Sequence, residues 1–219
     1  MSIQDVQNEF LFRLDKLGTN ASQNIGLPQF VSLINKAQLH WAESRIKASE
    51  ATKTRVDELQ QLLSDYDNTG TSKENYCRVA LPDDYFHPVR VYSTVKGCKS
   101  YVYGKFVEEG NVGTLLQGAF TKPSIAWEET LVTVFKDHLR VYFDGFTIER
   151  TFLKYYRLPK MVDIKGYIKS DGTNSSNVDL EFDDVNAQEI IDLAAQIAAA
   201  DIGDIQRLQI LARHTQENS

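Results

Sequence analysis

The spacing of apolar residues changes twice along the chain. Up to about residue 65, apolar positions recur at spacings of three and four, which is typical of amphipathic helices. From Tyr76 to Phe182 apolar and polar residues mostly alternate, which is typical of half-buried strands. From Asp184 the helical spacing returns. This order predicts an α+β fold, in which helices from both ends of the chain form one layer and an antiparallel sheet or small sandwich is inserted in the middle.

Two helices are expected before the sheet. The first covers residues 3–17, and the second covers residues 28–65, because no Pro or Gly interrupts it after Pro28. The second helix is apolar at both ends, whereas residues 43–55 are mostly polar, with Ala48 and Ala51 three positions apart. A helix with a polar middle either breaks there, exposes its middle to solvent, or packs its middle on another subunit. We expect the polar stretch to contact a neighbouring copy of the chain.

The middle of the chain predicts strands joined by short turns. Residues 65–75 are expected to form a loop, and residues 108–111 a turn. Hairpins are expected at Lys96-Gly97 and Asp144-Gly145, because Gly accepts the positive φ of such turns. The expected strands are 76–81, 89–93, 100–103, 132–135, 139–143, 146–158, 164–168 and 178–182.

The last segment predicts helices again. Asp183 or Asp184 is the expected N-cap. Gly203 is expected to break the helical region, and the apolar residues from Ile205 to Leu211 predict a second short helix. The expected organisation is therefore N-terminal helices in 1–75, an antiparallel β region in 76–182, and C-terminal helices in 183–219 that pack with residues 1–75.

Composition and charge narrow the class of protein. The chain has 219 residues, is 42% hydrophobic and contains no apolar run long enough to cross a membrane. No signal peptide is expected, and two scattered cysteines indicate reduced thiols. The net charge is −6, and residues 183–219 hold seven acids against Arg207 and Arg213. An acidic C-terminal region repels nucleic acid.

The residues capable of catalysis or metal binding do not form a convincing pattern. The four histidines are His40, His87, His138 and His214, and they lack metal-ligand spacing. The adjacent acids are Asp83-Asp84, Glu128-Glu129 and Asp183-Asp184, which are more typical of turns and caps than of catalytic pairs. The loop 171–177 resembles a calcium loop but lacks the closing Glu. We therefore expect no enzyme activity and no catalytic, cofactor-binding or metal residues.

The sheet region is rich in tyrosine. The tyrosines that could stack on nucleic-acid bases are Tyr92, Tyr101, Tyr103, Tyr142, Tyr155 and Tyr156. Half-buried sheet faces also favour tyrosine, and the sequence shows no basic groove beside these residues. A small nucleic-acid-binding protein or enzyme therefore stays the alternative prediction.

Several short phrases resemble one family of structural proteins. They are Ile34-Asn35-Lys36-Ala37-Gln38 with Trp41; Leu81-Pro82-Asp83-Asp84-Tyr85; Lys122-Pro123-Ser124 before Trp127-Glu128-Glu129; Leu139-Arg140-Val141-Tyr142 before Tyr155-Tyr156-Arg157-Leu158-Pro159; and Asp179-Leu180-Glu181-Phe182 before Glu189-Ile190-Ile191-Asp192-Leu193-Ala194-Ala195. In this order and spacing, the chain resembles the head-to-tail connector proteins of tailed bacteriophages. These are the adaptor or ring proteins below the portal, similar to tail tubular protein A, as found in podovirus-like and crAss-like phages.

The resemblance implies a structural role in the virion. Twelve copies would form a ring in the phage neck or tail, between the portal or an adjacent ring and the next tail protein. Genome DNA would pass through the ring without sequence-specific binding, and no membrane would be involved. The protein would be made in the host cytoplasm and would carry no catalytic residues. A closed ring needs two different complementary flanks on each subunit, because cyclic contacts are heterologous.

Overall fold

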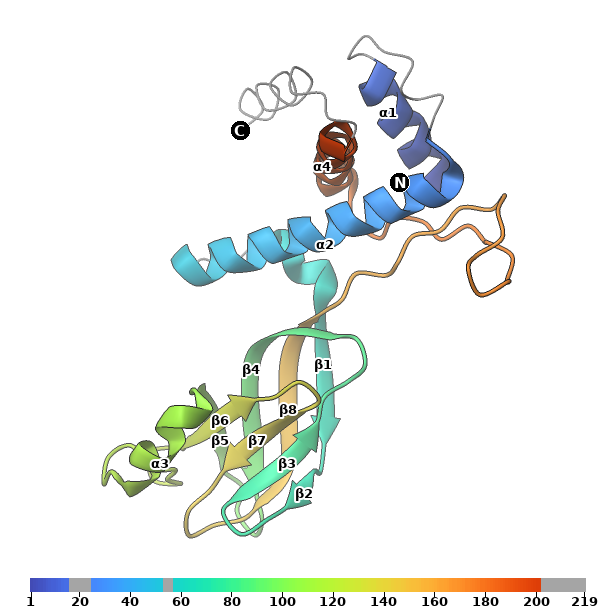
Figure 1. Cartoon of the computed structure of the whole chain (residues 1–219). Coiled ribbons are helices and arrows are strands. Elements are labelled where there is room, and N and C mark those ends of the chain that lie inside the picture. The colour runs from blue at the N-terminus through green and yellow to red at the C-terminus, as the bar shows by residue number, and fades with distance from the viewer. Residues whose placement is uncertain (16–24, 53–56, 202–219) are drawn as a thin grey trace. The chain divides into compact units, whose positions relative to one another are not determined.

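Helices and sheet occupy separate compact units. The computed structural model of the chain describes residues 1–15, 25–52 and 57–201. One unit, the helical unit, combines Met1–Gln61 with Pro159–Ser219, and the other, the β unit, is Leu62–Leu158. The sheet is therefore inserted in sequence between two segments that fold together (Figure 1). This arrangement confirms the α+β class, and segments from both ends of the chain lie in one unit.

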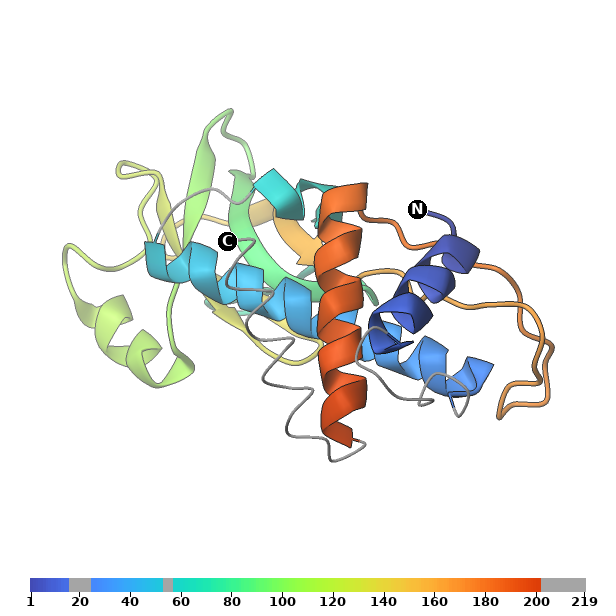
Figure 2. The same ribbon diagram turned by 90° about the horizontal axis from the view of Figure 1, so that it is seen from above.

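Three helices build the described part of the helical unit: α1 (Ile3–Asp15), α2 (Leu27–Thr52) and α4 (Asp184–Asp201). Helix α4 crosses α2, and α1 lies beside α4 (Figure 2). The apolar stripe of α1 is buried, and its Phe10 packs on Phe30 of α2 with ring centroids 5.4 Å apart. Trp41 packs edge-on against Phe182 at 5.0 Å. Aromatic contacts thus join α1 to α2, and α2 to the segment just before α4.

Helix α4 begins where the sequence predicted. The Asn186 N–H donates to Asp183 Oδ1 at 2.8 Å, so Asp183 is the N-cap. The buried face of α4 consists mainly of small or β-branched residues: Ala187, Ile190, Ile191, Ala194, Ala195, Ala198 and Ala199. Alanines on this face allow the crossing helix to approach closely. The second short helix expected after Gly203 lies outside the described residues.

The expected extent of α2 is wrong. In the described part of the chain the helix reaches Thr52, a 3-10 helix covers Asp57–Leu62, and residues 63–68 form a strand, β1 (Leu63–Asn68). The polar sequence of β1 hid the strand, because β1 is an edge strand with one face in solvent. Its pairing along its whole length with β8 (Ile148–Arg157) decides its conformation. A second short strand, β2 (Thr71–Ser72), occupies another part of the expected loop, and residues 69–70 and 73–75 remain irregular.

The remaining strands are β3 (Tyr76–Ala80), β4 (Tyr85–Val95), β5 (Tyr101–Phe106), β6 (Glu129–Val134) and β7 (His138–Tyr142). The eight-stranded sheet has the order β1-β8-β4-β5-β6-β7-β3-β2. All pairs are antiparallel except β5 with β6, which is parallel. The expectation of a purely antiparallel sheet is therefore wrong for this one pair.

The parallel pair explains an unexpected helix. Parallel neighbours require a crossover connection, and this one contains α3 (Glu109–Gln117), where the sequence predicted a turn. Two glycines, Gly110 and Gly113, obscured the helical pattern. Val112 of α3 packs with Leu131 and Tyr142, so α3 covers the outer face of β6 and β7.

Two glycine turns have different outcomes. At Gly97, with φ +76°, the expected hairpin between β4 and β5 is confirmed. At Gly145, φ is +71°, as a tight turn requires, but the flanking strands β7 and β8 are not neighbours in the sheet. The expected hairpin at Asp144-Gly145 is therefore wrong, because this turn carries the chain across the core instead of along the sheet.

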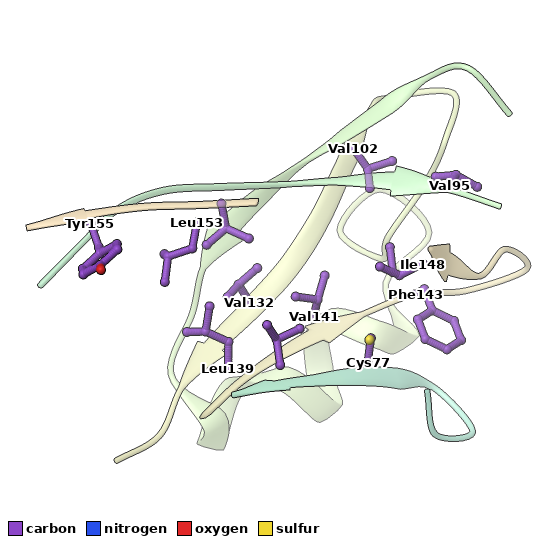
Figure 3. Packing of buried hydrophobic residues seen from close by; sticks show 12 residues of the cluster. Cys77, Val95, Val102, Val132, Leu139, Val141, Phe143, Ile148, Leu153 and Tyr155 are labelled. Carbon is purple, nitrogen blue, oxygen red and sulfur yellow. The ribbon is translucent and has the colours of Figure 1, made fainter. Parts of the chain in front are cut away.

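The core of the β unit shows how the sheet is bent. Leu153 and Tyr155 of β8 share one buried cluster with Leu139 and Val141 of β7, although three strands separate β7 from β8 (Figure 3). The sheet therefore curls so that strands far apart in its order enclose a common core.

Residues 159–182 do not contain the two expected strands. Only isolated bridges join Asp163 to Val178 and Ile168 to Asn174 in this segment. The alternation that suggested a strand at 178–182 reflects an extended chain on the helices, because Leu180 and Phe182 are buried in the helical unit. The sheet thus ends at Arg157, not at Phe182.

Candidate interaction surfaces

The residues considered for chemistry remain dispersed. His40 is exposed on α2, His87 lies on β4, and His138 is buried on β7, while His214 lies outside the described residues. His138 Nδ1 lies 2.7 Å from Asp137 Oδ1. Within the described ranges, no group of three or more His, Cys, Asp or Glu side chains could hold a metal ion.

The adjacent acid pairs have structural contacts. Tyr155 donates its hydroxyl to Asp84 at 2.8 Å, and burial, followed by this bond, raises the pKa of Tyr155 to about 12. Asp183 caps α4, as described above. Glu128 has a φ of +53°, and its carbonyl oxygen accepts the Tyr103 N–H at 2.7 Å. These contacts account for the acids as parts of turns and caps.

The polar loop at 171–177 is organised by a buried carboxylate outside it. Asp163 accepts hydrogen bonds from Tyr167 and from the Ile164 and Ser176 amides, and its Oδ2 lies 2.8 Å from Lys169 Nζ. Burial alone would raise the pKa of Asp163, but Lys169 and these donors lower it to about 2. The loop is therefore a turn held in place by Asp163. The carboxylate oxygens of Asp163 already accept hydrogen bonds from these donors.

Five of the six sheet tyrosines fall into two groups. Tyr142 and Tyr155 are buried, whereas Tyr92, Tyr101 and Tyr103 lie on the outer face of β4 and β5. Figure 3 shows Val95 and Val102 of the same two strands turned inward, and side chains alternate along a strand. Tyr156 lies on β8 and is half-buried.

The outer tyrosines form a packed cluster with one phenylalanine, which we call the aromatic face: Tyr92, Tyr101, Tyr103 and Phe152. Tyr92 stacks on Phe152 with centroids 5.0 Å apart and planes 10° apart. Tyr101 and Tyr103 contact the same Tyr92 ring at 5.7 and 6.4 Å. Despite these contacts, Tyr101 is 44% exposed and Tyr103 is 39% exposed.

Basic side chains share this face, which the sequence did not reveal. The Arg90 guanidinium lies 4.7 Å from the Tyr103 ring centroid, an attractive cation–π geometry. Lys154 and Arg150 of β8 are paired with Asp65 and Asp67 of β1, each at 3.2 Å. Cross-strand register places Arg90 opposite Lys154. Arg90 and Lys154 are 64 positions apart in the sequence but are neighbours in the sheet. Their proximity therefore follows from the strand order and not from the local sequence.

The turn of the β4–β5 hairpin adds two more cations. Lys96 and Lys99 are exposed beyond the last cross-strand pair, Thr94 with Tyr101. Cys98 between them is also exposed, and a hydrogen bond with Ser100 lowers the pKa of its thiol. A signal was present in the sequence: residues 85–107 contain Arg90, Lys96, Lys99 and Lys105 and no acidic residue.

The helical unit has a groove between α2 and α4. It has a volume of about 730 Å³ and is lined by residues including Trp41, Arg45, Val185, Glu189 and Leu193. Glu189 accepts hydrogen bonds from Trp41 at 2.7 Å and from Arg45 at 2.6 Å. Val185 at its rim is 74% exposed. The charges in this groove are therefore largely neutralised within the unit.

A further apolar surface lies in the connection between α3 and β6. Phe120 is 88% exposed and Trp127 is 68% exposed. Glu128 and Glu129, both exposed, follow Trp127 directly. Two large aromatic side chains exposed in one short connection are unusual for a surface without a partner.

The polar stretch of α2 gives a mixed outcome. Ile46 is buried, and Arg45 is bound to Glu189 and lies 3.5 Å from Glu58, so part of the stretch packs within its own unit. Ala48 is exposed, whereas the side chain of Ala51 lies outside the described residues. Contact of this stretch with a neighbouring copy stays a prediction.

Comparisons with known proteins add no family to this description. No protein-family model and no curated protein sequence matches the chain. Among the described helices, none is both long and apolar enough to cross a membrane.

Proposed function

We propose that this chain is a structural virion protein that forms a ring, about twelve copies around, in the neck or tail of a tailed bacteriophage. The ring lies between the portal and the tail and lines the path of DNA ejection. The resemblance of the sequence phrases to connector proteins suggests this role. The structural observation that supports it best is the exposure of Phe120 and Trp127 in the α3–β6 connection.

A ring subunit needs two unlike surfaces, because each copy contacts its neighbours through opposite flanks. The α3–β6 connection offers one, with two aromatic side chains beside Glu128 and Glu129. The groove of the helical unit offers another, with Val185 exposed at its rim. Tryptophan and other aromatic side chains supply much of the binding energy at protein interfaces. These surfaces differ in shape and chemistry, as heterologous contacts require.

The test is the native mass of the purified chain, with electron microscopy of the same sample. We expect closed rings with a mass close to twelve times the 24.9 kDa of one chain. Replacing both aromatics, Phe120→Ser with Trp127→Ser, should leave the subunit folded but abolish rings, since both side chains are exposed. Phe12→Ser is the matched control, because Phe12 is 54% exposed on α1 of the other unit.

A chain that stays monomeric or dimeric at high concentration contradicts the proposal. Rings that form normally with both substitutions would remove the α3–β6 connection from the interface. An enzyme or a small binding protein, the alternative prediction, gives no ring in the first measurement.

A further inference from the structure

The β4–β5 hairpin concentrates positive charge in an acidic protein. Its four basic residues are Arg90, Lys96, Lys99 and Lys105, and the segment 85–107 has no acid, although the whole chain has a net charge of −6. All four side chains are exposed. Among the described residues, none of the four takes part in an ion pair. Exposed positive charges without an acidic partner point to an anion outside the subunit.

The turn of the hairpin holds no acid, but Glu149 on β8 lies near the turn and Glu129 on β6 lies farther from it. Glu129 stands opposite Tyr103 on β6, and Glu149 follows Ile148, the β8 partner of Val95. The turn itself presents Lys96 and Lys99, and Gly97 and Cys98 lie between them in the sequence. The cations thus extend from the outer face of the sheet to the tip of the hairpin.

The aromatic face decides what kind of polyanion fits. Base stacking needs open ring faces, but Tyr92 is stacked on Phe152 and Tyr103 carries Arg90 at 4.7 Å. The rings therefore pack on one another, and one of them positions Arg90. The groups available to bind an anion are the exposed positive charges, not the ring faces. Evenly spaced phosphates suit such cations, whereas unpaired bases would find few free ring faces.

We infer that the β4–β5 hairpin binds the phosphate backbone of double-stranded DNA without reading its sequence. Arg90, Lys96, Lys99 and Lys105 contact phosphates, and the aromatic face keeps the hairpin rigid. Each subunit binds weakly, because few phosphates are contacted. This inference is independent of ring assembly, although a ring would present the hairpin many times and strengthen the contact by multivalency.

The main test measures binding of the full-length chain to a short fluorescent DNA duplex over a series of salt concentrations. Each phosphate contact contributes about 0.9 to the slope of log affinity against log salt. Lys96→Gln with Lys99→Gln should therefore reduce this slope by about 2. Duplexes of different sequence should bind alike. Lys73→Gln with Lys136→Gln is the matched control, since both lysines are exposed in other turns of the β unit.

A second readout uses the natural thiols. Cys98 is exposed in the hairpin turn, whereas Cys77 is buried. Bound DNA should slow the alkylation of Cys98, because phosphates cover the turn and disfavour its thiolate. Alkylation of Cys77 in unfolded chain gives the reference rate. No protection of Cys98 at saturating duplex would place the DNA elsewhere and overturn the assignment.

Other outcomes also decide the matter. Equal loss of slope in the control variant means that general charge, not the hairpin, binds DNA, and overturns the inference. Tighter binding of single strands with little salt dependence would indicate base stacking instead. Loss of rings in Lys96→Gln with Lys99→Gln, with DNA binding unchanged, would assign the hairpin to a protein interface. A monomeric chain that still shows the expected slope change keeps this inference while refuting the ring.

Discussion

The helical unit and the β unit use their charges differently. In the helical unit, Arg13 pairs with Asp192, Arg45 with Glu189, and Lys169 with the buried Asp163. The first two pairs connect segments far apart in sequence, and the third fastens a loop. In the β unit, the hairpin cations Lys96 and Lys99 are exposed in a turn and have no ion-pair partner among the described residues. The helical unit thus pairs these charges within itself, whereas the β unit pairs some of its charges between strands and presents its hairpin cations to solvent.

This difference separates internal structure from external recognition. A charge paired across segments contributes to stability and is costly to remove, particularly when it is buried. A charge exposed in a turn contributes little to stability and can be removed without unfolding the protein. The comparison therefore predicts large stability effects in the helical unit and binding effects without stability loss in the hairpin.

The largest stability effect is expected at Asp163. Asp163→Asn should lower the free energy of unfolding at pH 7 by about 2 kcal/mol, because its charged and polar donors lose their carboxylate. Urea unfolding followed by circular dichroism measures this loss. Asp15→Asn is the control, since Asp15 is an exposed carboxylate at the end of α1. A change as small as that of the control would show that Asp163 does not fasten its loop.

The same carboxylate predicts a pH dependence. Its pKa is about 2 in the folded protein and 3.8 in the reference state, so the folded protein favours the charged form. The stabilisation is complete above pH 4 and is lost as pH falls toward 2. The difference in stability between the natural chain and Asp163→Asn should therefore shrink by about 1–2 kcal/mol over this range. The change is at the lower end of what the pKa shift implies, because Lys169 is partly exposed and water screens its charge.

Sequence patterns predicted the helices better than the strand pairings. The stripe at Val6, Phe10 and Leu14 predicted α1, because a helix is determined by spacing within one segment. Lys96-Gly97 and Asp144-Gly145 give the same local signal, but only the first joins paired strands. A turn residue sets the backbone angle locally, whereas the choice of neighbour strand depends on the whole core. Pairing across the sheet therefore could not be derived from the turn.

The candidate hairpin was also only partly predictable. Its tyrosines were recognised, but Arg90 and Lys154 meet only because β4 pairs with β8, and no local pattern reports that pairing. The acid-free run around Lys96 and Lys99 was visible in the sequence and was the available signal. The net charge of the whole chain does not indicate this basic run, because the acidic residues of the helical segments outnumber these cations.

A smaller effect is expected at Glu189. Glu189→Ala should cost about 1 kcal/mol, because Trp41 loses the acceptor of its indole N–H and Arg45 loses an ion pair that is partly exposed to water. Glu189→Gln should recover part of the loss, since the amide oxygen still accepts from Trp41. Urea unfolding of the two variants measures both values. Equal losses for Ala and Gln would show that the charge, not the acceptor, matters.

The smallest effect is expected for an exposed ion pair between two strands of the β unit. Lys154 Nζ lies 3.2 Å from Asp65 Oδ1, but the side chains are 40% and 76% exposed. Water screens such a pair, and ordering two side chains opposes it, so the coupling should be below about 0.5 kcal/mol. A double-mutant cycle with Lys154→Gln and Asp65→Asn isolates this coupling from the effect of each single change. Adding salt should reduce it further. A coupling comparable to the loss at Asp163 would mean that an exposed pair of the β unit stabilises as much as the buried carboxylate of the helical unit, and the contrast between the two units would fail.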